Sequence, residues 1–306
     1  MTQGRTIRIY LVDGEPTGIL TAEIINWTGK VLVASRTQLS QLSKREEVRR
    51  TGVYCILGPD PENPNREIVY IGEGDNVIKR LTDHDKDDSK DFWTRCIVVI
   101  SKDQNITKSH GRYLESRLIS MGHEAGRARI QNGTAPPPPS LPEPDIADME
   151  YFISQLQMVF PVLGFGFLQP KAVATAIPGP AGESMSPIFC LNLVGAEAKA
   201  REIGDSFVVL KGSTARKQGL KSWTSYKALR DQLVADGKMV DSHNPDFYVF
   251  AEDVEFSSPS AGAACVNAGN SNGRTNWKVA DTGETYQQWH DKKIGAAKVM
   301  STDSNE

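Results

Sequence analysis

The sequence has few cysteines and no apolar stretch long enough to cross a membrane. Its four cysteines, Cys55, Cys96, Cys190 and Cys265, stand apart from one another in the 306-residue chain. This spacing matches no metal-binding pattern, so we expect buried thiols in place of a structural metal site. The longest apolar run, residues 158–168, is short and is interrupted by proline and glycine. The N-terminal residues form no apolar signal core, and we expect a reduced, cytoplasmic protein.

A strong excess of charge of either sign is also lacking. The chain has 35 lysines and arginines against 38 aspartates and glutamates, a formal net charge of −3. No overall basic field therefore attracts nucleic acid over a distance, and any such contact must come from a local patch. The hydrophobic content of 39% and the charged content of 24% are typical of a soluble globular protein with one to three domains.

Residues 51–133 contain the most informative pattern in the chain. Two apolar runs, 52–57 and 67–72, flank a loop rich in Pro, Asn and Asp, which predicts a β-hairpin. A helix start follows the hairpin, then a third apolar run at 92–100 and a helix over 107–121. We predict an α+β fold in which a small mixed or antiparallel sheet with flanking helices is built in the order β-β-α-β-α.

The remaining sequence divides around this central unit. Residues 1–50 alternate apolar and polar positions and then turn charged, which predicts a β-rich extension plus a helix. Four consecutive prolines open the segment 134–204, which we interpret as a semi-rigid spacer, one helix and a flexible linker from 169 to about 200. A separate small α+β domain is expected over 205–296, followed by a loose tail over 297–306.

The central unit contains the groups that phosphodiester hydrolysis requires. A carboxylate such as Glu115 can hold a divalent cation, and an arginine such as Arg80 can stabilise charge on the phosphate. Some further group must orient or deprotonate a water molecule, and Tyr54 and Tyr70 lie on neighbouring predicted strands. Residue type alone is not specific, because tyrosine is common in strands and an arginine three residues before Asp83 also forms ordinary helical ion pairs.

The order of these residues resembles the GIY-YIG nuclease family. Gly52-Val53-Tyr54 corresponds to the first motif and Tyr70-Ile71-Gly72 to the second, and an arginine and a helical glutamate follow in the expected order. The family includes homing endonucleases, some restriction enzymes and a subunit of bacterial excision repair. The resemblance covers about residues 51–132 and implies an endonuclease with one metal ion in each active site.

The resemblance implies a role for each matching residue. Tyr54 would activate or orient the attacking water, and Tyr70 would line the site and contribute a hydrogen bond. Arg80 would face the scissile phosphate, and Glu115 would bind a single Mg²⁺ or Mn²⁺. His84 lies one helical turn after Arg80, where some members of the family place a histidine that aids proton transfer.

Several further residues are candidates for contacts to nucleic acid. They are Lys79, Lys86, Lys90 and Asn132, the last at a position where an asparagine often closes the domain. Glu73 departs from the family pattern, since many members carry a lysine or arginine there. An acid at that position either removes a phosphate contact or helps to hold the cation, and the sequence leaves both possibilities open.

Ordinary structural roles remain open for some of these residues. His84 could be a surface histidine, and Glu115 could pair with a neighbouring arginine such as Arg112 or Arg117. Asn132 precedes a glycine, and this pair is also typical of a turn.

The C-terminal part resembles a second family, the domain of unknown function 4357. The resemblance covers about residues 205–290 and depends on a strand at 207–211, the small-residue segment 256–264 and Trp277. That domain is similar to one associated with restriction enzymes and adenine methylases, which implies a module that selects or holds DNA. Ser258 and Ser260 begin the small-residue helix, whose N-terminus can bind phosphate. The alternative is that these serines only cap the helix.

The sequence therefore predicts a metal-dependent endonuclease that hydrolyses DNA phosphodiester bonds, with the C-terminal domain aiding target binding. The expected cofactor is one Mg²⁺ or Mn²⁺ per site, with no organic cofactor and no membrane partner. Cutting both strands would require a homodimer or two successive nicks. Two alternatives stay open, a catalytically silent sensor of DNA structure or modification and a nuclease directed at RNA.

Overall fold

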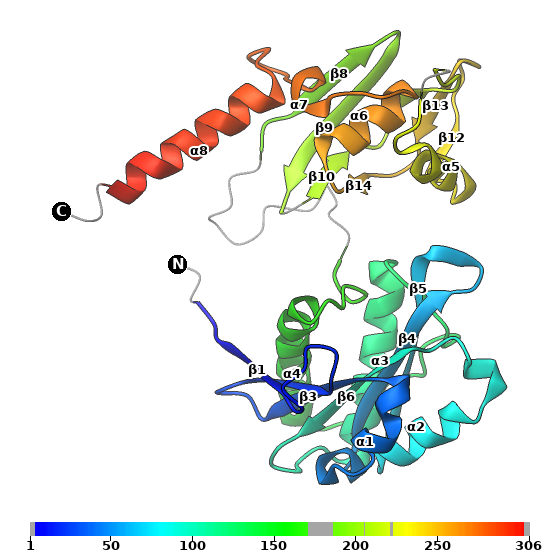
Figure 1. Ribbon diagram of the computed structural model, residues 1–306, viewed down its shortest axis with the longest axis vertical. Helices are drawn as coiled ribbons and strands as arrows, with labels where there is room; N and C mark the ends of the chain where they lie inside the picture. Colours follow the sequence, from blue (N-terminus) through cyan, green and yellow to red (C-terminus); the bar gives the residue numbers. More distant parts are fainter. Residues whose placement is uncertain (1–3, 171–185, 205, 221–222, 303–306) are drawn as a thin grey trace. The chain divides into compact units, whose positions relative to one another are not determined.

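The computed structural model describes residues 4–170, 186–204, 206–220 and 223–302. The chain forms two compact units, Met1–Lys171 and Ala172–Glu306 (Figure 1), which we call the N-terminal and C-terminal units. Within the described residues, no helix has both the length and the apolar composition that a membrane span needs.

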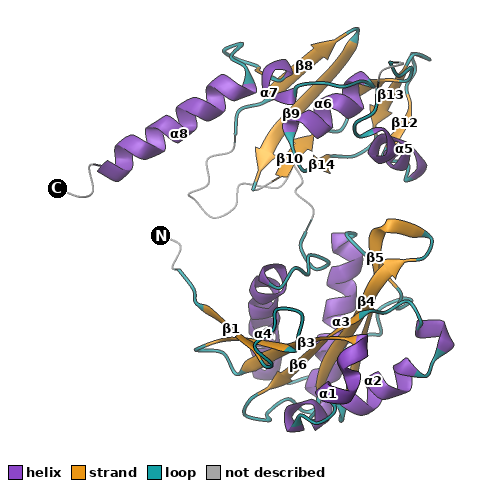
Figure 2. Ribbon diagram, viewed as in Figure 1, coloured by secondary structure: helices purple, strands orange, loops and turns teal. Residues whose placement is uncertain are grey.

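A seven-stranded sheet forms the centre of the N-terminal unit (Figure 2). The strand order is β1-β2-β3-β6-β4-β5-β7, and only the pairing of β5 with β7 is parallel. The expected α+β class and mixed sheet are confirmed. The N-terminal strands extend this same sheet, because β3 pairs with β6 along its whole length. The strands are β1 (Ile7–Leu11), β2 (Leu20–Ile24), β3 (Gly29–Ser35), β4 (Gly52–Asp60), β5 (Asn63–Gly74), β6 (Arg95–Ser101) and β7 (Arg129–Ile130).

Helices cover both faces of this sheet. Alternate residues of a strand point to opposite faces, so β4 directs Val53 and Cys55 to one core and Tyr54 and Ile56 to the other. The first core includes side chains of α3 and α4, and the second includes side chains of α1 and α2. The helices are α1 (Leu39–Leu42), α2 (Val77–Asp85), α3 (Lys108–Ala125) and α4 (Glu143–Val162), with short 3₁₀ turns at Arg36–Gln38, Glu46–Arg49 and Asp88–Lys90.

The helix after the proline run belongs to the N-terminal unit, which differs from the expected spacer. Phe152 of α4 packs against Trp27, with ring centroids 4.8 Å apart. Glu150 accepts hydrogen bonds from Tyr113 Oη at 2.8 Å and Arg117 Nε at 2.6 Å, which joins α4 to α3. The proline run therefore does not separate domains, because the apolar face of α4 is buried in the same core as α3.

The C-terminal unit contains two antiparallel sheets and four helices among its described residues. The larger sheet has the order β14-β10-β9-β8-β15 and the smaller has the order β11-β13-β12. The expected separate α+β domain is confirmed. Its elements are β8 (Phe189–Leu193), β9 (Ala196–Ile203), β10 (Ser206–Val209), β11 (Thr214–Arg216), α5 (Lys227–Ala235), β12 (Met239–Asp241), β13 (Phe247–Phe250), β14 (Val254–Phe256), α6 (Pro259–Asn267), α7 (Gly273–Asn276), β15 (Lys278–Val279) and α8 (Tyr286–Thr302).

Two segments of this unit differ from the expected linker and tail. Residues 171–185 of the linker lie outside the described residues, but β8 and β9 form an antiparallel pair where the linker was expected to continue. Buried alanines alternate with exposed charged residues along β9, and this strand pattern is hidden by an alanine-rich composition. The backbone of α8 is helical to Thr302, consistent with the helix-forming alanines and lysine before it. Residues 303–306 lie outside the described residues.

Candidate active site

Three aromatic side chains from separate elements meet on one face of the N-terminal sheet, and we call them the Tyr–His cluster. Tyr54 Oη of β4 lies 2.7 Å from His84 Nε2 of α2, a hydrogen-bond distance. The Tyr70 ring of β5 meets the His84 ring edge-on, with centroids 5.1 Å apart, and lies 6.4 Å from the Tyr54 ring. Tyr54 is completely buried and His84 is 7% exposed. The structure thus brings together three residues that the sequence predicted as catalytic.

The second glycine of the hairpin pattern makes room for the Tyr54 hydroxyl. Gly72 pairs directly with Tyr54 across the two strands. A Cβ atom at Gly72 would collide with the Tyr54 hydroxyl oxygen. Any larger residue there must displace the ring of Tyr54, which is completely buried in a close-packed core. The glycine therefore has a direct role in placing the hydroxyl against His84.

Burial sets the protonation states in the Tyr–His cluster. It is the largest cause of the raised pKa of Tyr54, and the positive charge of Arg80 opposes it. Burial likewise raises the pKa of Tyr70 and lowers the pKa of His84, and the charges of Arg80 and Lys90 lower the latter further. At neutral pH both phenols are therefore protonated and the imidazole is neutral. In this state the Tyr54 hydroxyl can donate its proton to His84 Nε2.

Arg80 lies beside the Tyr–His cluster and remains accessible to solvent. It precedes His84 by one turn of α2, so the two side chains share a face of the helix. Its electrostatic interaction with the Tyr54 phenol is the largest cause of its raised pKa, and a hydrogen bond to Tyr54 adds to it. Its Cγ would lie 2.8 Å from a Cβ at Gly74, so this glycine lets the arginine pass close to β5. Arg80 thus combines a contact with the buried Tyr54 phenol and access to solvent.

Glu115 of α3 lies close to a second carboxylate, that of Glu73. Burial, followed by the negative charge of Glu73, raises the pKa of Glu115, while a hydrogen bond with the Glu73 main chain lowers it. Glu73 Oε2 is buried and has no hydrogen-bond partner among the described residues. Arg112 Nε is 3.9 Å from the other oxygen of Glu73, and that arginine side chain is 59% exposed. The pair of carboxylates is therefore only weakly compensated by positive charge.

The outer edge of β5 explains how α3 reaches this site. Ile71 donates its main-chain N–H to Asn132 Oδ1 at 2.8 Å and accepts from Asn132 Nδ2 at 2.7 Å. Alternate residues of a strand direct their N–H groups to the same edge, so the main chain of Glu73 faces the same side as that of Ile71. Asn132 and Glu115 consequently both bind this strand edge. The Asn132 amide thus holds the edge of β5 through one hydrogen bond at each of its polar atoms. Its expected contact with nucleic acid stays a prediction.

Of the three predicted phosphate-contacting lysines, one lies at the Tyr–His cluster. Lys90 Nζ is 3.8 Å from the centroid of the Tyr70 ring and donates to Gln131 Oε1 at 2.7 Å. Lys86 is exposed just after the end of α2. Lys79 lines a separate depression of about 320 Å³ together with residues before β4. The structure therefore brings Lys90 to the candidate site but not Lys79.

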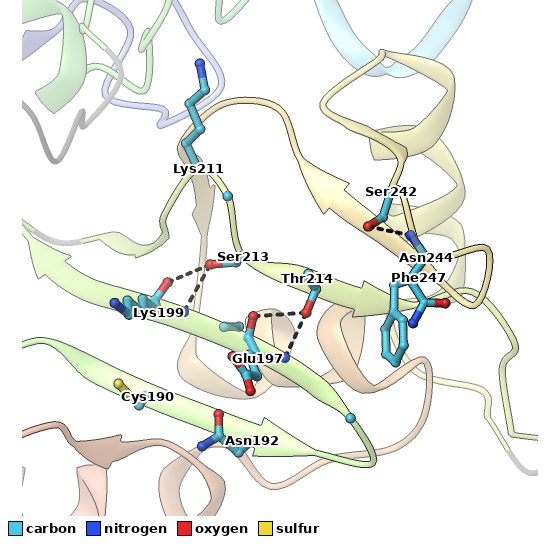
Figure 3. A pocket seen from close by; sticks show the side chains of 13 residues that line it. Cys190, Asn192, Glu197, Lys199, Lys211, Ser213, Thr214, Ser242, Asn244 and Phe247 are labelled. Carbon is cyan, nitrogen blue, oxygen red and sulfur yellow. Dashed lines mark hydrogen bonds between the residues drawn. The ribbon is translucent and has the colours of Figure 1, made fainter.

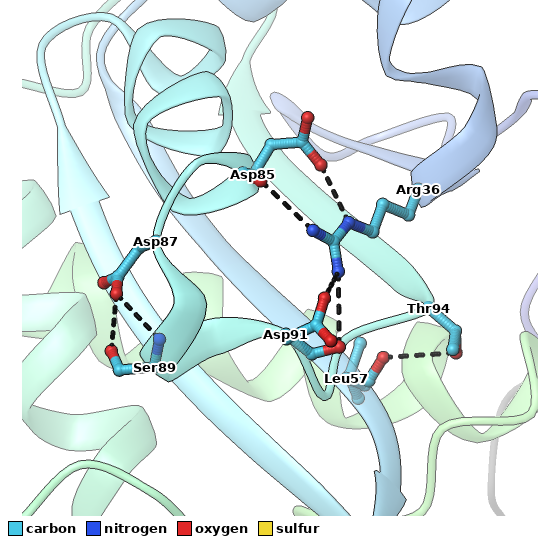
Figure 4. A network of polar contacts seen from close by, with 7 residues as sticks. All are labelled: Arg36, Leu57, Asp85, Asp87, Ser89, Asp91 and Thr94. Carbon is cyan, nitrogen blue, oxygen red and sulfur yellow. Dashed lines mark hydrogen bonds and ion pairs between the residues drawn. The ribbon is translucent and has the colours of Figure 1, made fainter.

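An arginine that the sequence did not single out holds the segment that carries Lys90 (Figure 4). Arg36 Nε is 2.7 Å from Asp85 Oδ1, and its Nη1 is 2.9 Å from Asp91 Oδ1. The guanidinium also lies over the Trp93 ring, 5.1 Å from the centroid. These contacts tie the end of α2 to the segment after it. They join residues about fifty positions apart, so no local spacing indicates them.

The residues that could hold a metal ion are few. Among the described residues, no group of three or more His, Cys, Asp and Glu side chains has the arrangement of a metal site. Glu115 and Glu73 supply two carboxylates next to the Tyr–His cluster. Mg²⁺ commonly binds one or two carboxylates, retains several waters and takes its other ligands from a substrate phosphate. The donor set therefore fits a hard divalent cation of this type.

The two predicted serines of the C-terminal unit accept hydrogen bonds from main-chain N–H groups. Ser258 Oγ accepts from the Ala261 N–H at 3.2 Å, and Ser260 Oγ accepts from the Gly273 N–H at 3.0 Å. Both hydroxyl oxygens are therefore engaged in local structure. Ser258 thus caps α6, whereas Ser260 lies within α6 and holds the first residue of α7. Their expected contact with nucleic acid stays a prediction.

A cavity of about 670 Å³ in the C-terminal unit is lined by residues of β8, β9 and β11 and by the turn between β12 and β13 (Figure 3). Ser213 Oγ accepts from the Lys199 N–H at 3.0 Å, and Thr214 Oγ1 accepts from the Glu197 N–H at 2.8 Å. These hydrogen bonds join β9 of the larger sheet to the segment that begins β11 of the smaller sheet. The hydroxyls of Ser213 and Thr214 are thus already used within the fold.

The comparisons with known proteins concern the C-terminal unit. Residues 188–290 match the model of a family described as a domain of unknown function, DUF4357. The second resemblance seen in the sequence is therefore confirmed, and it begins earlier than expected, just before β8. Comparisons with curated proteins and with solved structures found no match.

Proposed function

We propose that the protein is a metal-dependent endonuclease that hydrolyses phosphodiester bonds in DNA. The active site is the Tyr–His cluster with Arg80 and Glu115. The observation that carries this proposal is the convergence of these side chains from β4, β5, α2 and α3, which lie far apart in the sequence. A buried hydrogen-bonded tyrosine and histidine beside an exposed arginine and two carboxylates match the needs of phosphodiester hydrolysis.

The Tyr–His cluster supplies a path for a proton from the attacking water. The water donates its proton to Tyr54 Oη while the original hydroxyl proton of Tyr54 passes to His84 Nε2. The imidazole becomes positively charged and the phenol stays neutral, so the cluster never requires a buried phenolate. The lowered pKa of His84 keeps its acceptor atom available at neutral pH. Tyr70 packs against the imidazole and fixes its orientation.

Arg80 is the group that meets the phosphate. Its guanidinium can bind two phosphate oxygens at once and stabilise the charge that develops on them. Because Arg80 is exposed while Tyr54 is buried, a phosphate bound by the arginine lies at the open side of the cluster. Lys90, over the ring of Tyr70, adds positive charge beside the substrate.

Glu115 and Glu73 together would hold the divalent cation. The unpartnered buried oxygen of Glu73 and the raised pKa of Glu115 both indicate a pair of carboxylates that lacks positive charge. The acid at Glu73, which departs from the family pattern, would then serve as a second cation ligand. When bound, the cation neutralises charge on the phosphate oxygens.

A plasmid-nicking experiment tests the proposal. Purified protein is incubated with supercoiled plasmid, single-stranded DNA and RNA, each with Mg²⁺, with Mn²⁺ and with EDTA. We expect metal-dependent nicking of DNA that is abolished in Glu115→Ala and Arg80→Ala. Glu67→Ala serves as a control, because Glu67 is an exposed acid on β5 that pairs with Arg95. Nicking that survives both active-site substitutions would overturn the proposed site.

The same experiment separates the two alternatives. Binding of DNA without cleavage under any of these metal conditions would favour the catalytically silent sensor. Cleavage of RNA but not of DNA would favour the RNA-directed nuclease. The C-terminal unit is proposed to aid target binding in each case.

A further inference from the structure

The C-terminal unit buries an arginine that has no carboxylate partner among the described residues. Arg230 of α5 is 3% exposed. Its Nη2 donates to the main-chain oxygens of Arg216 and Lys217, the latter at 3.2 Å. Both acceptors are neutral, and burial lowers the pKa of Arg230. The charge of Asp231 favours the charged form of Arg230, but Asp231 forms no ion pair with it among the described residues. A buried cation is costly unless an anion compensates it, so a further anion here would stabilise the guanidinium.

Two aromatic rings hold the guanidinium in a fixed position. Arg230 Cζ is 5.2 Å from the centroid of the Trp223 ring and 5.4 Å from that of the Tyr248 ring. Lys217 Nζ is 5.1 Å from the Tyr248 ring and forms an ion pair with Asp241 at 2.7 Å. Stacking of this type preorganises an arginine and reduces the entropy lost when it binds a ligand.

A cavity of about 580 Å³ lies against this arginine. One face of α5 forms part of its wall, because Lys227, Arg230, Asp231 and Val234 recur at helical spacing along it. Lys227 and Asp231 are exposed, and Lys217 completes the basic side of the wall. Positively charged side chains therefore outnumber the single acid that lines the cavity.

We propose that this cavity binds a phosphate group through Arg230 and Lys227. A guanidinium fork matches phosphate oxygens, and Trp223 and Tyr248, which hold the guanidinium, line the same cavity. The phosphate can belong to a nucleic acid or to a free phosphate compound. The inference deepens the proposed role of the C-terminal unit in target binding and rests on that proposal, but it does not depend on cleavage by the N-terminal unit.

Binding measurements on the full chain test this site. The background is Glu115→Ala in EDTA, so that cleavage has no influence on the result. Affinity for a fluorescently labelled DNA duplex is measured by anisotropy over a series of salt concentrations, and affinity for inorganic pyrophosphate is measured by calorimetry. The variants are Lys227→Ala and Arg230→Lys, which retains the charge but not the fork. Lys211→Ala is the matched control, because Lys211 is an exposed lysine that lines the other cavity (Figure 3).

If the phosphate belongs to a nucleic acid, Lys227→Ala makes the negative slope of log affinity against log salt shallower by about 0.9, which corresponds to the loss of one phosphate contact. Lys211→Ala leaves the slope unchanged. For a free phosphate compound, the same variants weaken only the binding of pyrophosphate. Unchanged affinity for both probes in both variants overturns the site. Circular dichroism reports folding, and if Arg230→Lys does not fold, Lys227→Ala and Lys227→Glu decide the outcome. If the unaltered chain does not nick DNA in the plasmid experiment but these binding effects are observed, the nuclease proposal alone is contradicted.

Discussion

Replacing Glu73 by glutamine tests whether the two carboxylates at the edge of β5 form a cation site. In the cation-free protein, Glu73 keeps one oxygen buried without a hydrogen-bond donor, and its charge raises the pKa of Glu115. Glutamine has nearly the same shape but no charge, and its amide can donate to Glu115. The substitution should therefore stabilise the cation-free protein and weaken its response to a divalent cation.

The contacts of Glu73 give the size of the effect. An unpaired buried polar group costs about 1–3 kcal/mol. The ion pair with the 59% exposed Arg112 is lost and contributes at most about 1 kcal/mol. The expected net gain is about 1 kcal/mol, or a rise in Tm of about 2–4 °C for a unit of this size.

The pH dependence of this gain follows from the raised pKa of Glu115. A carboxyl group whose pKa is raised on folding favours the folded state at low pH, and this contribution is lost as the pH rises through the folded value. The repulsion that Glu73→Gln relieves is therefore present at neutral pH. It disappears in acid, below the ordinary glutamate pKa of about 4.3.

Thermal unfolding in EDTA and in saturating MnCl₂ measures both effects. A cation at about one hundred times its Kd stabilises the folded chain by about 2.7 kcal/mol, and Glu73→Gln should reduce this response. Glu67→Gln on the same strand should respond to Mn²⁺ as the unaltered protein does. If Glu73→Gln lowers the Tm in EDTA, or retains the full response to Mn²⁺, the paired-carboxylate site is refuted.

Three further substitutions probe the surroundings of the site. Gly72→Ala should cost about 1–3 kcal/mol through overpacking against the Tyr54 hydroxyl and should reduce plasmid nicking, and urea unfolding together with nicking rates will show whether both occur. Lys90→Met should raise the pKa of His84 and move the acid limb of the nicking rate to higher pH, whereas an unchanged pH–rate profile would exclude His84 as the proton acceptor. Arg36→Met should increase hydrogen exchange of the amides at 86–91, and equal protection would show that this arginine does not hold the segment.

The parts of the fold that sequence reasoning predicted well depend on local patterns. The hairpin around Tyr54 and Tyr70 follows from two apolar runs and a turn-rich loop, and Asn76 marks the start of α2 by accepting the Lys79 N–H. Gly72, which lies opposite Tyr54, was recognised in the sequence as part of the Tyr-Ile-Gly motif. Its reason, the space needed by a hydroxyl on the next strand, becomes visible only in the paired sheet.

Long-range packing decided the features that the sequence did not predict. The proline run was interpreted as a boundary, but Phe152 beyond it packs on Trp27 from the start of the chain. The contacts of Arg36 join segments with no shared motif. The hydrogen bonds of Asn132 to the main chain of Ile71, 61 positions earlier, follow from the register of β5 and from no local pattern. Local spacing carries no information on such partners, because tertiary contacts select them.

Glu73, the second carboxylate of the candidate site, also shows what the sequence alone could not predict. The sequence indicated that Glu73 was unusual but could not distinguish a lost phosphate contact from a cation ligand. The observation that favours the cation ligand is three-dimensional, because the buried oxygen of Glu73 lacks a partner among the described residues and its charge acts on Glu115.

Anomalous diffraction from crystals of the chain grown with Mn²⁺ would test the central claim most directly. The account predicts one strong peak in each molecule, in contact with the carboxylates of Glu115 and Glu73 and beside Arg80. The claim is contradicted if the chain nicks plasmid with Mn²⁺ but the peak lies elsewhere. It is also contradicted if crystals show no peak at these carboxylates under conditions that support nicking.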